Sequence, residues 1–268
     1  MRIEPASKEE GDYIFEELRK ALREQPVLPR TTRLATSTLG HSAKERDVVL
    51  VGKGKVTALQ SGLPDDECEA ALNCTYLAHY YASSRAKPDE PAWAERYAKF
   101  MTISGWPMVN QTIQTQKDHW VGRNTVASVT FALLHEVKET ELGEFMAHHL
   151  RAIEGNSASM KRFHSPTHEK TASFQMLPVK GDGRGNPTLV FTSLATQSGS
   201  ERDWGKLRNV VDFFSGSHDM TFQGRASRHS LDERLYQTRL PTIKLCMDEL
   251  ALTGYSDIAE NFNASVRR

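Results

Sequence analysis

The chain has 268 residues and a mass of 30.1 kDa, and its 38% of hydrophobic residues suffice for a folded core, which excludes wholesale disorder. Its 34 basic and 34 acidic residues give a net charge of zero, which argues against a nucleic-acid-binding protein that works through bulk positive charge. The longest uninterrupted apolar runs have four residues, whereas a membrane span needs about 20, so we expect no transmembrane segment.

The amino-terminal residues lack the apolar stretch of a Sec signal peptide. We therefore expect cytoplasmic synthesis and, where the protein leaves the cell, release by a route without a Sec signal. The three cysteines, Cys68, Cys74 and Cys246, are too few and too irregularly spaced for a disulfide framework. This cysteine usage fits a reducing compartment.

The first half of the chain carries mainly helical patterns. Ser7 and Glu10 form a capping box that opens a first helix, which ends at Pro26. Residues 26–47 show no periodicity and are predicted to be a linker. Residues 120–137 fit a helix or a strand, and we favour the helix. Further helices are predicted over 65–86, from Pro91 to a C-terminal cap at Gly105, and over 142–153, with short strands at 48–51 and 109–113.

The carboxyl-terminal part of the chain changes character. Alternating patterns, joined by links too short for crossover helices, predict strands at 173–176, 189–194, 207–214 and 220–222. A second capping box, Ser230 and Glu233, opens a long helix that Pro241 is expected to kink or split, and a short helix is predicted over 256–264. These patterns predict an α+β class in a single domain, 1–268, with a helical half at about 1–155 and an antiparallel four-stranded meander plus C-terminal helices at about 170–268.

Histidines are the first candidates for a reaction centre. His164 and His168 stand four apart beside Glu169, the spacing that places two zinc ligands on one helix face. Pro166 interrupts such a helix and the Glu of a His-Glu-x-x-His motif is missing, so we expect no metal or other cofactor. The candidate ligands are His149, which is more simply a buried histidine, His164, His168 and Glu169. No Gly-x-Ser-x-Gly elbow surrounds Ser157, Ser193, Ser215 or Ser227.

Cysteines and aromatic residues have a simple interpretation as core. Cys68 and Cys74 are six apart and form no redox Cys-x-x-Cys pair, so core packing is preferred for all three cysteines. Seven aromatic residues cluster in the two helices after residue 65 and in the segment that follows them, and five of these are the main candidates for a function. They predict either an interdigitated core or a surface that contacts a protein or lipid: Tyr76, Tyr80, Trp93, Tyr97 and Trp106.

Three stretches resemble a bacterial family of soluble, mostly uncharacterised proteins. The similar positions lie within about residues 70–255: Leu77, Ala78, Trp93, Tyr97 and 103–106; Phe174 and Gln175 before a Gly-rich turn and a second strand; and Leu231, Tyr236, Arg239, Ile243 and Lys244. The family implies no agreed reaction and no catalytic residue. A looser similarity to bacterial factors that promote colonisation of insect guts implies an α/β fold with a lipid-modified cysteine, which makes Cys68, Cys74 and Cys246 candidate attachment sites.

We therefore expect a non-enzymatic bacterial host-association, virulence or toxin-accessory protein that acts through contacts with a protein, a host surface or a peripheral lipid, and not with nucleic acid. Two alternatives remain open. One is a hydrolase or metal-dependent enzyme whose site is assembled from distant residues, with His149, His164, His168 and Glu169 as first candidates. The other is a membrane-active protein that inserts amphipathic helices after a pH change sensed by its ten histidines.

Overall fold

The computed structural model describes residues 7–24, 48–52, 55–86, 91–117, 126–154, 168–181, 186–203, 220–252 and 260–262. Within these ranges the chain forms helices α1 (Lys8–Arg23), α2 (Asp65–Ser83), α3 (Pro91–Ile103), α4 (Val126–Glu136), α5 (Thr140–Glu154) and α7 (Glu233–Leu252). The strands are β1 (Val48–Gly52), β2 (Lys55–Leu59), β3 (Met108–Lys117), β4 (His168–Lys180), β5 (Thr188–Asp203), β6 (Met220–Ser230) and β7 (Glu260–Phe262).

The described strands form one mixed sheet in the order β3-β6-β5-β4-β2-β1-β7. The α+β class is confirmed, and three strands of the predicted antiparallel meander are present as β4, β5 and β6. The prediction of four meander strands that form their own sheet is wrong. β5 pairs directly with β6, so a strand at 207–214, which lies outside the described residues, does not stand between them. β3 from the first half of the chain pairs with β6, and β2 runs parallel to β4. Both halves of the chain therefore share one sheet.

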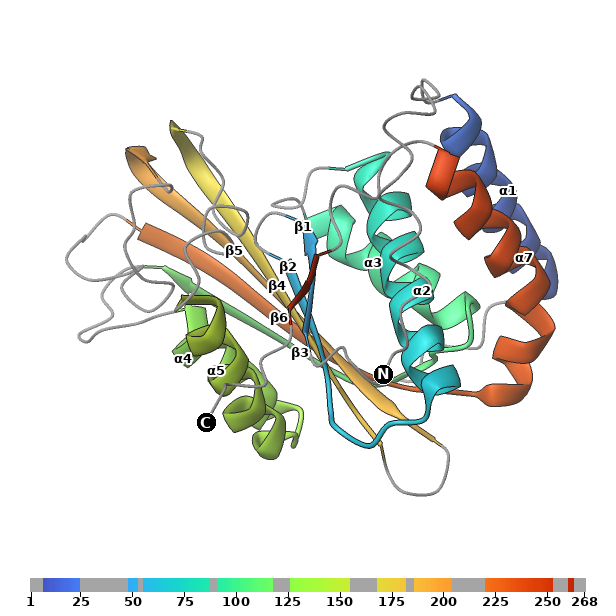
Figure 1. Cartoon of the computed structure of the whole chain (residues 1–268). Coiled ribbons are helices and arrows are strands. Elements are labelled where there is room, and N and C mark those ends of the chain that lie inside the picture. The colour runs from blue at the N-terminus through green and yellow to red at the C-terminus, as the bar shows by residue number, and fades with distance from the viewer. Residues whose placement is uncertain are drawn as a thin grey trace.

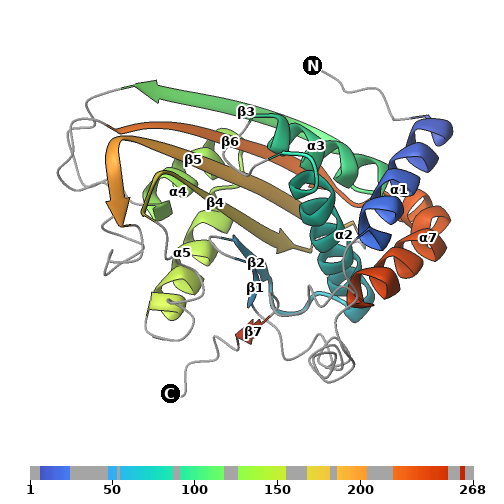
Figure 2. The same cartoon turned by 90° about the horizontal axis from the view of Figure 1, so that it is seen from above.

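Helices cover both faces of this sheet (Figure 1). α4 and α5 lie on one face, whereas α2 and α3 lie on the other, with α1 and α7 packed outside them (Figure 2). Because side chains alternate along a strand, Phe191 of β5 and Ser227 of β6, which are opposite each other in the register, face the α2–α3 layer. Gly224 of β6 faces the other layer and lies against Leu133 of α4.

Aromatic rings join α3 to the sheet. Trp93 and Tyr97 of α3 are stacked with ring centroids 5.3 Å apart, and Tyr97 stacks on Phe191 of β5 at 4.3 Å. Edge-on packing of Phe15 in α1 against Phe100 in α3, with centroids 5.3 Å apart, continues the core to the outer helices. The core on this side of the sheet is therefore continuous from β5 to α1.

The amphipathic α1 begins where its capping box predicts. The Ser7 Oγ accepts a hydrogen bond from the Glu10 backbone N at 3.1 Å. Glu249 of α7 accepts hydrogen bonds from Arg19 and Arg23 of α1 at 3.0 Å and 3.1 Å, which holds the two outer helices together. The apolar stripe of α1 is buried, as predicted: Ile14, Phe15, Leu18 and Leu22.

The end of α3 is tied to the start of α7 through a left-handed glycine. Gly105 has φ of +107°, and the Trp106 N donates to the Met101 carbonyl at 2.8 Å, which closes α3 in a Schellman arrangement. The predicted cap at Gly105 is confirmed. Its carbonyl accepts a hydrogen bond from the Asp232 N at 2.8 Å, just before α7. The Ser230 N at the end of β6 donates to the Pro107 carbonyl at 3.3 Å, so the segment around Trp106 is held by α3, β6 and α7.

Several other predicted elements can be compared with the structure. α4 confirms the helix favoured within 120–137. α7 continues through Pro241 without splitting, because Pro241 and Gln237 are exposed and water can bind the carbonyl that loses its partner. The terminal helix predicted over 256–264 is wrong where it is described: residues 260–262 form β7, which pairs with β1. The linker predicted over 26–47 lies outside the described residues.

Tyr97→Phe is expected to raise the free energy of unfolding by about 1 kcal/mol. Tyr97 is buried, and its hydroxyl has no hydrogen-bond partner among the residues that the structure describes. The substitution removes the desolvation cost of that hydroxyl and keeps the stacked ring. Urea unfolding measures the change, with Tyr13→Phe as the exposed control, expected to differ from wild type by less than about 0.5 kcal/mol. A less stable Tyr97→Phe protein would show that the hydroxyl is paired.

Candidate functional site

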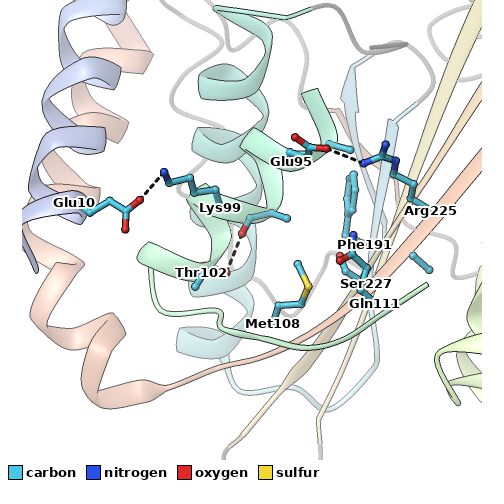
Figure 3. Close-up of a pocket in the computed structure, with 12 residues that line it drawn as sticks. Glu10, Glu95, Lys99, Thr102, Met108, Gln111, Phe191, Arg225 and Ser227 are labelled. Atoms are coloured by element: carbon cyan, nitrogen blue, oxygen red, sulfur yellow. Dashed lines mark hydrogen bonds and ion pairs between the residues drawn. The ribbon is translucent and has the colours of Figure 1, made fainter. Parts of the chain in front are cut away.

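A cavity of about 270 Å³ lies between α3 and the strands β3, β5 and β6, beside the first turn of α1 (Figure 3). Its volume is close to the lower end of the range for small-molecule sites. Much of its wall is apolar: Ala94, Ala98, Met108 and Phe191. Polar and charged side chains complete the lining: Thr102, Gln111, Ser227, Glu10, Glu95, Lys99 and Arg225.

One wall is a single face of α3. Ala94, Ala98 and Thr102 follow each other at intervals of four residues, and residues at this spacing lie on the same side of a helix. The two alanines leave space that larger side chains would fill. The Thr102 hydroxyl donates to the Ala98 carbonyl at 3.0 Å, so this polar group is already engaged by its own helix. The α3 wall is therefore smooth and weakly polar.

The charged groups of the cavity form two ion pairs (Figure 3). Arg225 Nη1 of β6 lies 3.6 Å from Glu95 Oε1 of α3, and Lys99 Nζ of α3 lies 2.6 Å from Glu10 Oε1 of α1. The Arg225 side chain is 13% exposed, whereas its partner Glu95 is 69% exposed. Lys99 and Glu10 are also well exposed. Arg225 is therefore the charged group of the cavity that is most withdrawn from water.

Ser227 and His229 form a hydrogen-bonded pair on one face of β6. Ser227 Oγ lies 2.9 Å from His229 Nε2, and His229 Nδ1 lies 2.8 Å from the carbonyl oxygen of Trp106. Because a carbonyl oxygen only accepts, Nδ1 carries the ring proton, and Nε2 accepts the hydrogen of the Ser227 hydroxyl. Both side chains are buried, and Ser227 is part of the cavity wall.

The imidazole of His229 is held neutral. Burial lowers the pKa of His229 to about 4, although its hydrogen bond to the Trp106 carbonyl acts in the opposite direction. At neutral pH Nε2 therefore carries no proton and accepts the hydrogen bond from the Ser227 hydroxyl. In serine nucleophiles, an imidazole activates the serine hydroxyl, and a hydrogen-bond acceptor on the other ring nitrogen orients the imidazole. Ser227, His229 and the Trp106 carbonyl are arranged in this order.

The candidate metal ligands that the structure describes lie in two different elements, α5 and β4. His149 is buried in α5, with its ring edge-on to Phe145 at a centroid distance of 4.4 Å. His168 and Glu169 begin strand β4, so the helical spacing that suggested a zinc pair of His164 and His168 does not apply to His168. His164 lies outside the described residues. In the described ranges, no three His, Cys, Asp or Glu residues gather as a metal ion requires. The expectation of no cofactor stays a prediction.

All three cysteines are free thiols in the core. Burial raises the pKa of Cys68 to about 11 and those of Cys74 and Cys246 to about 12, so each stays protonated at neutral pH. The Cys74 Sγ donates to the Ser104 carbonyl at 3.8 Å. Lipid attachment at a cysteine stays a prediction, and it requires that a buried thiol first become accessible.

The five aromatic residues proposed as a contact surface lie in the core: Tyr76, Tyr80, Trp93, Tyr97 and Trp106. Their burial against other helices and the sheet leaves them no exposed face for a partner, so the interdigitated core describes their packing. Among the residues described, the exposed large apolar side chains are Tyr13, Val109, Ile113, Phe131 and Leu245. No helix in the described ranges combines the length and apolar character needed to cross a bilayer.

The pair of Ser227 and His229 was not found from the sequence. Ser227 does not belong to a nucleophile elbow, because no glycines flank it at the required spacing. A local signal exists: in a strand, residues two apart lie on one face, so the order Ser227-Arg228-His229 places the hydroxyl beside the imidazole. No local sequence pattern could indicate the Trp106 carbonyl that binds His229 Nδ1, because Trp106 is far from β6 in the sequence.

No known family model matches the chain, and no curated protein is similar to it in sequence. Among solved structures, the chain is similar to that of the Evf virulence factor, with a TM-score of 0.37 and 11% sequence identity, over 90% of this chain and 88% of that chain. A similarity to a virulence factor, which the sequence resemblance led us to expect, is thus present among solved structures. It carries no information about a ligand, a partner or a reaction.

Proposed function

We propose that the protein acts by binding a small amphipathic molecule with an anionic end in the cavity between α3 and the sheet. The observation that carries this proposal is the position of Arg225. Its side chain is largely removed from water in a wall that is otherwise mainly apolar, and its ion-pair partner Glu95 is an exposed side chain.

The anionic end follows from the guanidinium group of Arg225. An arginine has five N–H donors, and the contact with one oxygen of the exposed Glu95 at 3.6 Å is long for a hydrogen bond. Withdrawing a cation from water is costly unless it is well paired. A carboxylate or phosphate on a ligand would offer the bidentate geometry that arginine favours. An anion in the cavity is therefore expected to compete with Glu95 for Arg225.

The apolar part and the size follow from the remaining lining. Ala94, Ala98, Met108 and Phe191 offer no charge to a ligand, so a hydrocarbon segment replaces water there favourably. A volume of about 270 Å³ limits the buried part of a ligand to a short chain or a single ring. Recognition of such an amphiphile is the form of contact that we propose for the host-association, virulence or toxin-accessory role.

Arg225→Gln is expected to weaken binding of octanoate by about 10-fold to 100-fold, because the hydrogen bonds to a charged group are lost. Octanol, which has the same chain without the charge, should bind wild type and Arg225→Gln equally. Isothermal titration calorimetry measures both ligands. The matched control is Arg234→Gln, which removes an exposed arginine of α7 and should bind octanoate as wild type does.

A second variant tests the location of the site. Ala98→Phe places a ring in the space beside Phe191 and is expected to remove binding of both octanoate and octanol. Far-UV circular dichroism confirms that the variant is folded. Wild-type affinity for octanoate in both Arg225→Gln and Ala98→Phe, or equal binding of octanoate and octanol to wild type, would contradict the proposal.

A further inference from the structure

We propose that Ser227 is the nucleophile of an acyl-transfer site, with His229 as its general base, and that this site hydrolyses small carboxylic esters. The inference rests on the proposed binding function, since the cavity must first hold the ester, and it adds a chemical step. It is carried by the hydrogen-bonded order of Trp106, His229 and Ser227, and by the place of Ser227 in the cavity wall.

The hydrogen bonds set the direction of proton transfer. The Trp106 carbonyl fixes the proton on Nδ1 of His229, so the nitrogen that faces Ser227 is the basic one. Trp106 lies in the segment where α3, β6 and α7 meet, so its carbonyl is held by the core and acts as a positioning group. The 2.9 Å contact between Oγ and Nε2 already has the length needed for general-base catalysis.

The wall around Ser227 fits an ester with a charged end. Phe191 lies opposite Ser227 in the strand register and gives an apolar surface beside the hydroxyl. Arg225 precedes Ser227 by two residues on the same face of β6, about 7 Å away along the strand. An ester whose anionic group pairs with Arg225 can therefore place its carbonyl carbon near Ser227 Oγ. The base itself is fully buried, which keeps bulk water from competing for Nε2.

The reaction then proceeds in two balanced steps. In the first, Ser227 Oγ bonds to the ester carbonyl carbon while its proton moves to His229 Nε2; the C–O bond to the alcohol breaks, and the alcohol leaves with that proton. In the second, water attacks the acyl-serine, gives a proton to Nε2, and the bond between the acyl carbon and Oγ breaks as Oγ regains the proton. The net change is ester plus water to carboxylic acid plus alcohol.

Covalent labelling with an alkyl fluorophosphonate tests the nucleophile. Intact mass and peptide mapping of wild type are expected to show one adduct, on Ser227. Ser227→Ala should abolish the adduct, and His229→Gln should slow labelling by at least about 100-fold. The matched control is Ser193→Ala, which removes another buried serine on the same face, opposite Arg225 in β5, and should leave labelling unchanged.

Hydrolysis of para-acetoxybenzoate and of its neutral methyl ester tests the reaction. Wild type and Ser193→Ala are expected to hydrolyse the anionic ester at equal rates, with kcat/KM at least about 10-fold above that for the neutral ester. Ser227→Ala should lower kcat by at least about 100-fold while it still binds octanoate, which shows that the cavity is intact.

The outcomes separate this inference from the proposed function. An adduct on a serine other than Ser227, labelling of Ser227→Ala, or no hydrolysis of either ester by wild type overturns the catalytic inference. If wild type still prefers octanoate to octanol in that case, the binding function stands alone. If wild type does not prefer octanoate to octanol, the binding function is contradicted. In that case a Ser227 adduct would still identify the nucleophile, but it would not support a preference for anionic esters.

Discussion

Gly105→Ala is expected to lower the free energy of unfolding by roughly 4 kcal/mol, the sum of backbone strain and overpacking. Gly105 has φ of +107°, a conformation that alanine adopts only under strain. A Cβ at this position would lie 2.7–2.9 Å from the Cβ, Cα and N of Tyr236, and the backbone atoms of α7 cannot move away as a flexible side chain could. Urea unfolding followed by circular dichroism measures the loss.

Gly62→Ala separates the two causes. Gly62 has φ of +88°, but a Cβ there would meet nothing within 4 Å, so its substitution should cost only the strain, about 1–2 kcal/mol. Equal losses in the two variants would show that the contact of Gly105 with α7 is unimportant. Because Gly105 precedes Trp106, whose carbonyl orients His229, its alanine variant should also lose fluorophosphonate labelling of Ser227 before it loses its fold.

Acidification from about pH 6.5 to pH 4 is expected to destabilise the protein by on the order of 3 kcal/mol for each of two buried histidines. Burial lowers the pKa of His149, and that of His229, from 6.5 to about 4. Between these values the unfolded chain binds protons that the folded chain refuses, so stability is fully present above about pH 6.5 and falls as the pH decreases. The loss saturates near pH 4, where the folded protein also takes up the protons.

His149→Leu measures the share of one histidine. The free energy of unfolding is obtained from urea titrations at about pH 7 and pH 4.5, and the difference between the two pH values should shrink in this variant by on the order of 2–3 kcal/mol. His135→Gln, which removes an exposed histidine at the end of α4, should leave the difference unchanged. Glu249 also contributes to the pH dependence of stability, because hydrogen bonds from Arg19 and Arg23 lower its pKa against the effect of burial. This contribution is the same in wild type and in His149→Leu, so it does not affect their comparison. A difference as large as that of wild type in His149→Leu would contradict the prediction.

Helices were largely predictable because their signals are local. Ser7 with Glu10 marked the start of α1, Gly105 marked the end of α3, and apolar residues at helical spacing marked the buried faces. Strand β7 was missed because residues 260–262 form a strand only through pairing with β1, from the other end of the chain. A strand of three residues is too short to show the alternating pattern from which strands are predicted.

The candidate site was hidden from the sequence for a related reason. The spacing of His164 and His168 suggested a pair on one helix face, but His168 begins strand β4 and is not part of a helix. Ser227 and His229 become a chemical unit only when the Trp106 carbonyl fixes the ring proton. Arg225 becomes a candidate anion site only when α3 covers its strand and withdraws it from water.

Local sequence patterns were enough to predict the α+β class, the starts and ends of several helices and the absence of long apolar runs, because each depends on residues within one or two turns of one another. The folded structure was needed to show that both halves share a sheet, that the aromatic residues form a core, and that a cavity lies beside Ser227. These features depend on contacts between distant segments, and the free energy of such contacts comes from burial that no local pattern records.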